Sequence, residues 1–185
     1  MKKYINKKTL SEQALYFGEV KMPKGFEIER DQLVKEILTS DYYQNVNYHI
    51  SKPWDKLVTY VREFLTYDQK FSIIDIGSYG SFFERNENSN MRLETDPMDL
   101  MHAPDFVLLY GVEIDPNTCS VDIHYDNNRV KGLVETVRLE NNWFIMFPAH
   151  LKYTIFNEGN SYLNFIQTIK FDLVGRKYDL VSPKY

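Results

Sequence analysis

The chain of 185 residues is long enough for one compact domain, which at this size buries about 70% of the surface exposed by its unfolded form. Apolar residues make up 43% of the chain and charged residues 26%, which excludes extended disorder and fits a globular protein. The net charge of −4 gives no basic excess, so we expect no broad nucleic-acid-binding face. The chain has no run of 18 apolar residues, so the sequence predicts no membrane-spanning segment.

Cys119 is the only cysteine, so no intrachain disulfide can form and a zinc site built from several thiolates is excluded. The first eight residues are basic but lack an apolar segment, so they do not have the pattern of a secretory signal. We therefore expect synthesis in the cytoplasm, a reducing compartment.

Two amphipathic segments come first along the chain. Apolar residues at helical spacing predict helices over residues 27–39 and 54–67, and Pro53 is tolerated in the first turn of the second. After about residue 70 the pattern is that of short strands separated by turn residues, with a hairpin expected at the Gly77–Gly80 pair and another at residues 126–128. The predicted strands are residues 71–76, 80–85, 106–114, 120–125, 130–139, 143–147, 152–157 and 162–173.

This order of elements predicts a mainly β member of the α+β class, a jelly roll with two N-terminal helices packed on one sheet. We divide the single domain into an N-terminal arm (1–16), a helical support (17–70), a jelly-roll core (71–173) and a C-terminal tail (174–185).

Four segments of the core carry a resemblance to a known family: residues 93–97, the apolar strand 105–113, the strand 122–126 with its turn, and residues 143–155 with the Phe147-Pro148 corner. Their order resembles the double-stranded β-helix of the 2-oxoglutarate and iron(II)-dependent oxygenases, in particular the prolyl-hydroxylase-like branch. The resemblance implies Fe(II) and 2-oxoglutarate as cofactors of an active member.

The metal ligands that the resemblance implies are largely replaced. The family holds Fe(II) with two histidines and one carboxylate. Aligned on these segments, the first histidine position is Glu94, the carboxylate is Asp96 and the distal histidine position is Tyr153. A phenol has a pKa near ~10 and is a poor ligand until it is deprotonated. We therefore interpret Glu94, Asp96 and Tyr153 as a degenerate metal site.

The position that anchors the cosubstrate is also changed. The resemblance implies an arginine about ten residues beyond the distal ligand, where this chain has Leu163 and Asn164. The only nearby cation is Lys170. We therefore predict neither metal nor cosubstrate for this chain.

Other histidines leave alternative ligand sets open. His102, Asp96 and His150 could form a set if the register is shifted by a few residues. His124 and Asp126 spell a His-x-Asp pair, but His150 follows after too few residues for the intervening strands. The alternative for each is an ordinary surface or hairpin imidazole.

Acidic residues near Pro97 leave a further possibility. Glu94 and Asp96, two apart on a strand, would point to one face and could hold Mg²⁺ or Ca²⁺ with help from Asp99. The alternative is a solvated acidic loop.

A jelly roll without its metal predicts a non-catalytic structural or assembly protein, forming a homo-oligomeric ring or a larger assembly. Apolar anchors spaced by charges in both terminal segments favour arms that order against a neighbouring subunit, although packing on the same domain remains open. These anchors are Tyr4, Ile5, Leu10, Tyr178, Leu180 and Tyr185.

The narrowest hypothesis places the protein in the neck, tail or baseplate of a tailed-phage virion. The chain is rich in Asn, Lys, Tyr, Ile and Phe, as expected of an AT-rich genome, and it resembles degenerate oxygenase-like domains of tailed phages. One alternative is an active hydroxylase that uses Fe(II) and 2-oxoglutarate. Another is a cupin-like module with an aromatic pocket near Tyr110, Tyr125, Trp143 and Tyr153.

Overall fold

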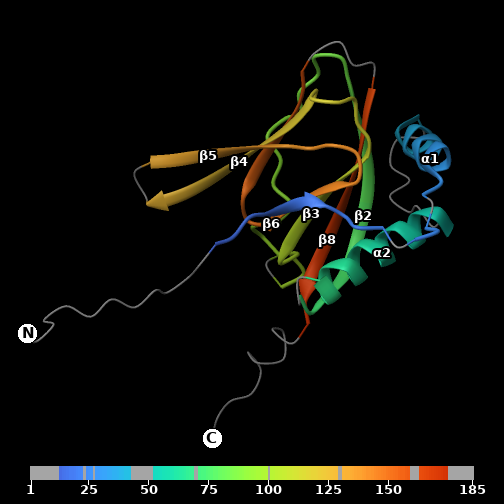
Figure 1. Cartoon of the computed structure of the whole chain (residues 1–185). Coiled ribbons are helices and arrows are strands. Elements are labelled where there is room, and N and C mark those ends of the chain that lie inside the picture. The colour runs from blue at the N-terminus through green and yellow to red at the C-terminus, as the bar shows by residue number, and fades with distance from the viewer. Residues whose placement is uncertain are drawn as a thin grey trace, which may run out of the picture.

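The computed structural model describes residues 13–22, 24–26, 28–42, 52–68, 71–99, 101–128, 131–158 and 163–174 (Figure 1). The apolar anchors of both terminal arms, residues 4, 5, 10, 178, 180 and 185, lie outside these ranges. Within the described part of the chain, no helix is long and apolar enough to cross a membrane.

The described residues form two helices and eight strands: β1 (Tyr16–Glu19), α1 (Arg30–Tyr42), α2 (Lys52–Asp68), β2 (Ile73–Glu84), β3 (Phe106–Glu113), β4 (Cys119–Asn128), β5 (Lys131–Arg138), β6 (Trp143–Pro148), β7 (Lys152–Asn157) and β8 (Leu163–Leu173). The larger sheet has the order β1-β6-β3-β8-β2, and the smaller has the order β5-β4-β7. Isolated antiparallel bridges at Asn88 and Arg92 extend the smaller sheet beyond β7. The two sheets form the predicted jelly roll, in which every strand pair is antiparallel.

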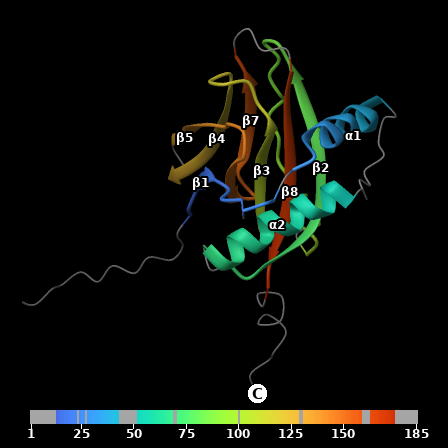
Figure 2. The ribbon, with the colours of Figure 1, turned by 45° about the vertical axis from the view of Figure 1, so that its right-hand side comes forward.

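The helices cover one face of the larger sheet, as predicted (Figure 2). In α2, residues at helical spacing are buried, among them Trp54, Val61 and Leu65, while Leu33 and Ile37 are buried in α1. They pack against the side of the larger sheet that carries Leu108, Tyr110, Val112, Met146, Phe165, Ile169 and Phe171. The first helix begins at Arg30, three residues later than predicted.

The predicted hairpin at Gly77–Gly80 is wrong, because these residues lie inside the single strand β2. All of β2 pairs with β8, with a bulge between Asp75 and Gly77. A Cβ on Gly80 would clash with Cγ1 of Ile37 and lie 3.1 Å from the Trp54 ring. Gly80 therefore allows the helices to approach the sheet and does not form a turn.

Two further boundaries differ from the prediction. Residues 16–19, assigned in part to a helical support, form β1 and pair with β6 at the edge of the larger sheet. Asp126 and the two asparagines after it, expected to form a turn, continue β4, and Asp126 pairs with Gly132 of β5. The β4–β5 hairpin is therefore longer than predicted, and it projects beyond the body of the sandwich (Figure 1).

A second core lies between the two sheets. Alternate residues of β3, β6 and β8 point away from the helices and into this space, where they meet the inner face of β4 and β7. Its members are fully or nearly fully buried and include Val107, Leu109, Val121, Ile123, Ile145, Phe147, Tyr153, Ile155 and Ile166.

Candidate functional site

Four polar side chains meet at one end of the space between the sheets: Tyr79, Glu94, Tyr153 and Lys170, which we call the central cluster. The Tyr79 and Tyr153 hydroxyls donate hydrogen bonds to Oε1 of Glu94, over 2.6 Å and 2.7 Å respectively. The Lys170 ammonium lies 2.8 Å from Oε2 of Glu94. Both oxygens of the carboxylate are therefore paired.

The sheets position the central cluster from opposite sides. On β2, Tyr79 is two residues from Gly77, the partner of Lys170 on β8, so both side chains share one face of the larger sheet. Nζ of Lys170 lies 5.5 Å from the centre of the Tyr79 ring, within cation–π range. In the smaller sheet, reciprocal backbone hydrogen bonds join Arg92 and Tyr153, which places Glu94 just beyond.

Burial and hydrogen bonding set the protonation states. Burial by itself raises the pKa of Glu94, but hydrogen bonds from Lys170, Tyr79 and Tyr153 outweigh it and hold that pKa below its ordinary value. Burial raises the pKa of Tyr153 far above its usual range, and the neighbouring Tyr79 and Glu94 raise it further. Burial, followed by the Glu94 charge, also raises the pKa of Tyr79. At neutral pH an ionised carboxylate therefore accepts from two neutral phenols beside an ammonium.

The donor set does not fit Fe(II). A transition ion takes deprotonated oxygen or sulfur ligands, or neutral imidazoles. The central cluster offers one carboxylate whose oxygens are already engaged, and the side chain of Glu94 is only 9% exposed. The Lys170 charge repels a cation at the same place. Among the described residues, no group of three or more His, Cys, Asp or Glu side chains could hold a metal ion.

Asp96 does not join Glu94, and the prediction that both carboxylates point to one face is wrong. The chain bends after Glu94 and does not continue as a pleated strand. Asp96 is exposed, and its Oδ1 accepts a hydrogen bond from the backbone N–H of Met98. Asp99 pairs instead with His102. This arrangement matches the solvated acidic loop, the alternative to a magnesium or calcium site.

The alternative ligand sets are not brought together. The ring of the exposed His102 contacts the Asp99 carboxylate, and His150 contacts the Gln13 side chain. His124 lies on β4 opposite Lys152 and Val134. Because Ile123 and Tyr125 point toward the other sheet, His124 points outward. The set of His102, Asp96 and His150 is therefore wrong.

The predicted anchor region has a structural role. Asn164 is fully buried, its amide donates to Asn157 and Thr118, and its oxygen accepts from the backbone of Asp115. Leu163 packs at the margin of the helix-side core. The cation of the central cluster is Lys170, which comes from β8 and not from the predicted anchor positions.

The four aromatic residues proposed to line one pocket lie apart. Tyr110 faces the helices and donates a hydrogen bond to Asn142, whereas Tyr153 faces the space between the sheets. Trp143 packs at the edge of that second core. Tyr125 lines two cavities that lie beside the hairpin.

The sequence reasoning missed Tyr79. Its neighbours Gly77 and Gly80 have the pattern of turn residues, which conceals its place on the inner face of the long strand β2. The alternation of Tyr79, Ser81 and Phe83 with Ser78, Gly80 and Phe82 is the signal that could have found it.

Comparisons with known proteins bear on the fold. No family model and no curated protein matches the sequence. Among solved structures, a Pseudomonas putida prolyl-4-hydroxylase matches with a TM-score of 0.60 and 9% identity, over 87% of this chain and 89% of the other. The non-haem alpha-ketoglutarate-dependent epimerase SnoN from nogalamycin biosynthesis matches with a TM-score of 0.60 and 7% identity, over 93% and 86%.

A Trichoplax adhaerens prolyl hydroxylase in complex with a hypoxia inducible factor peptide fragment matches with a TM-score of 0.56 and 8% identity, over 91% of this chain and 87% of the other. At such identities the likeness establishes the architecture and leaves the activity open. The chain has the double-stranded β-helix fold of the 2-oxoglutarate and iron(II)-dependent oxygenases.

Proposed function

We propose that this protein is a non-catalytic member of the oxygenase fold that serves as a structural component of a larger assembly. The observation that carries the proposal is the Lys170–Glu94 ion pair inside the central cluster. It neutralises the Glu94 carboxylate and gives both of its oxygens protein partners.

The packing between the sheets supports the non-catalytic part. Val107, Leu109, Phe147 and Ile166 fill this space with fully buried apolar side chains, and the Phe147 and Tyr153 rings meet edge to face at 5.2 Å. A dicarboxylate cosubstrate needs polar partners and room, and apolar side chains supply neither.

The surface supports the assembly part. Large apolar side chains are exposed in several places, among them Met91, Met98, Met101 and Val134. Methionine side chains adapt to varied partners, and an exposed apolar surface favours protein contacts. A narrower form of the proposal places the protein in a tailed-phage virion, supported by the composition and the resemblance described above.

Metal binding tests the non-catalytic part. We expect the purified full chain to bind no stoichiometric Fe(II) or Ni(II) by titration calorimetry, and to form no succinate from 2-oxoglutarate. Stoichiometric Fe(II) with 2-oxoglutarate-dependent succinate would contradict the proposal and favour the alternative, an active hydroxylase, which the shared fold supports.

A gain-of-binding variant checks the metal positions. Combining Glu94→His, Tyr153→His and Lys170→Ala supplies two imidazoles and removes the repelling charge, so we expect measurable Ni(II) binding. The matched control, Glu94→Gln with Tyr153→Phe and Lys170→Ala, removes the same groups without adding ligands. Equal binding by the two variants, with both folded, would show that these positions are not the degenerate metal site.

Sedimentation tests the assembly part. We expect the mass of the full chain to rise with concentration between about 1 and 100 µM, as for complexes of micromolar affinity. A monomer at all concentrations that also fails to bind purified phage particles would contradict this part.

A further inference from the structure

The outer edge of β5 is open along the described part of the chain. Within that part, β5 pairs only with β4, and the smaller sheet ends at β5. The backbone N–H of Leu139 donates a hydrogen bond to the carbonyl of Cys119, the residue directly opposite it in the β4–β5 register. This contact shows which residue pairs of the two strands are hydrogen-bonded to each other and which are not. Val134, Thr136 and Arg138 therefore direct their backbone groups away from β4.

In the described part of the chain, residues 132–136 along this edge are exposed. The β4–β5 hairpin projects beyond the body of the sandwich in both ribbon views (Figures 1 and 2). The edge carries no proline or bulge over residues 132–138, and the side chain of Val134 is 49% exposed. An open, partly apolar edge of this kind accepts an added strand.

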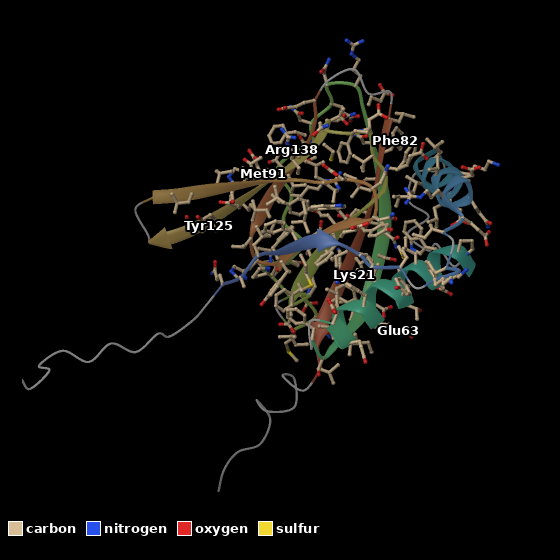
Figure 3. The ribbon with its side chains drawn as sticks, in the orientation of Figure 1. Lys21, Glu63, Phe82, Met91, Tyr125 and Arg138 are labelled. Carbon is tan, nitrogen blue, oxygen red and sulfur yellow. The ribbon has the colours of Figure 1, made fainter. Side chains whose placement is uncertain are left out.

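Two adjoining cavities lie beside the hairpin. One of about 350 Å³ is lined mainly by Ala14, Leu15, Ile123 and Glu135, and the other, of about 550 Å³, by residues that include Met91, Val134 and His150. Both are also lined by Gln13, Tyr125 and Leu151. Figure 3 shows Met91 and Tyr125 on the side from which the hairpin projects.

The N-terminal segment leads directly to these cavities. Gln13 is the first described residue, and its side chain contacts His150 at 3.1 Å. The twelve residues before it can span about 40 Å when extended, whereas the eight residues of β5 span about 27 Å. This segment contains three large apolar or aromatic residues, Tyr4, Ile5 and Leu10. Apolar side chains also line part of the cavity walls, so the two surfaces are chemically compatible.

Charge is also complementary. Residues 1–12 contain four lysines and one glutamate. The charged residues that line the two cavities are Asp126, Glu135 and Lys152, and the titratable His124 and His150 lie beside them. With both histidines neutral, the cavity walls carry a net negative charge and the segment a positive one.

We infer that residues 1–12 of one molecule bind in extended form along the β5 edge of a second copy, with their apolar side chains in the cavities beside its hairpin. This arm exchange rests on the proposed assembly function and names its partner, a second copy of this chain. Each molecule both donates an arm and offers an edge, so the contact can close into a dimer or propagate into a ring.

Three variants of the full chain test the exchange by sedimentation. Deletion of residues 1–12 removes the arm, and Val134→Pro removes one outward N–H without breaking a hydrogen bond to β4. We expect both to remain monomeric at concentrations where the unmodified chain has at least doubled its mass. Val134→Ala, the matched control, shortens the side chain but keeps the N–H, so it should still associate.

Cross-linking between copies identifies the contact. A chain carrying Lys8→Cys is mixed with a larger-tagged chain carrying Val134→Cys and treated with a short bis-maleimide. The native Cys119 is buried, and burial raises its pKa to about 12, so it does not compete. We expect a covalent heterodimer, and none when the second chain instead carries Tyr67→Cys, an exposed position on α2.

The outcomes separate this inference from the function on which it rests. Association that survives the deletion, or the absence of a heterodimer between the Lys8→Cys and Val134→Cys chains, would overturn the arm exchange and leave the assembly function standing. A full chain that never associates, alone or with particles, would overturn both.

Discussion

The two faces of the larger sheet differ in what they bury. Toward the helices, β8 presents Phe165, Ile169 and Phe171, which join an apolar core. Toward the smaller sheet it presents Ile166 at one end and Lys170 at the other. The helix-facing side is therefore mainly apolar, with Gln167 as a buried polar residue of β8, whereas the other side changes from apolar to charged toward the central cluster.

This difference separates the packing that holds the fold together from the polar cluster on which the proposed non-catalytic function rests. The helix-side core depends on close packing, so a change in volume affects it most. The central cluster depends on charge and hydrogen bonds between the two sheets, and burial of its ion pair is incomplete, since Lys170 remains 29% exposed. Substitutions on the two faces should therefore differ in size and in their response to pH.

The largest effect is expected on the helix side, from Trp54→Ala. The indole is almost fully buried, and its Nε1–H donates to Ser78 on β2. The cavity and the lost hydrogen bond should lower the free energy of unfolding by about 4 kcal/mol, measured by urea denaturation. Tyr67→Ala on the exposed side of α2 is the control and should change it little.

The central cluster should respond next, through Glu94→Leu. This change leaves the Lys170 ammonium and two buried phenols without their acceptor, and should lower the free energy of unfolding by about 3 kcal/mol. Adding Lys170→Met removes the charge that Glu94→Leu leaves without its partner. The double variant should therefore be more stable than Glu94→Leu alone. If Lys170→Met instead lowers the free energy of unfolding further, by as much as it does in the unmodified chain, the Glu94–Lys170 pairing is wrong.

A smaller loss is expected where the helices meet β2. Gly80→Ala places a methyl group against Ile37 and Trp54 and should cost about 2 kcal/mol in thermal or urea unfolding. Gly77→Ala, in the same strand, has no atom within 4 Å of the new Cβ and should be tolerated. Similar losses in both variants would mean that strand conformation, not helix packing, requires Gly80.

Acid should weaken the central cluster but not the apolar face. The pKa of Glu94 lies below its ordinary value of 4.5, so the unfolded chain binds more protons as the pH falls through this window. The stability that Glu94 provides is complete above pH 4.5 and is lost as the pH falls through the folded pKa. Glu94→Gln should flatten the decline of unfolding free energy below pH 4.5, and an unchanged profile would contradict the assignment.

The smallest effect is expected at Asp96, which belongs to neither face. Asp96→Ala removes one exposed hydrogen bond to the backbone of Met98 and should cost about 0.5 kcal/mol or less. Self-association and metal content should not change. Loss of a bound ion in this variant would restore Asp96 as a ligand.

The amphipathic helix α2 and the alternation of the later strands were predictable, because helix and strand periodicities leave a direct trace in the sequence. The jelly roll and its likeness to the oxygenase fold followed from the order of these elements. The continuity of β2 was not predictable from its glycines, since a glycine in a turn and one beneath a packed helix have the same local sequence signal.

The prediction that Glu94 and Tyr153 stand where the resemblance implies histidines comes from the sequence alone. Only the tertiary structure brings these residues into contact with Tyr79 and Lys170. Tyr79 and Lys170 are themselves 91 positions apart in the sequence. The physical reason is that an ion pair between sheets depends on strand register and on the distance between layers, and local sequence patterns specify neither.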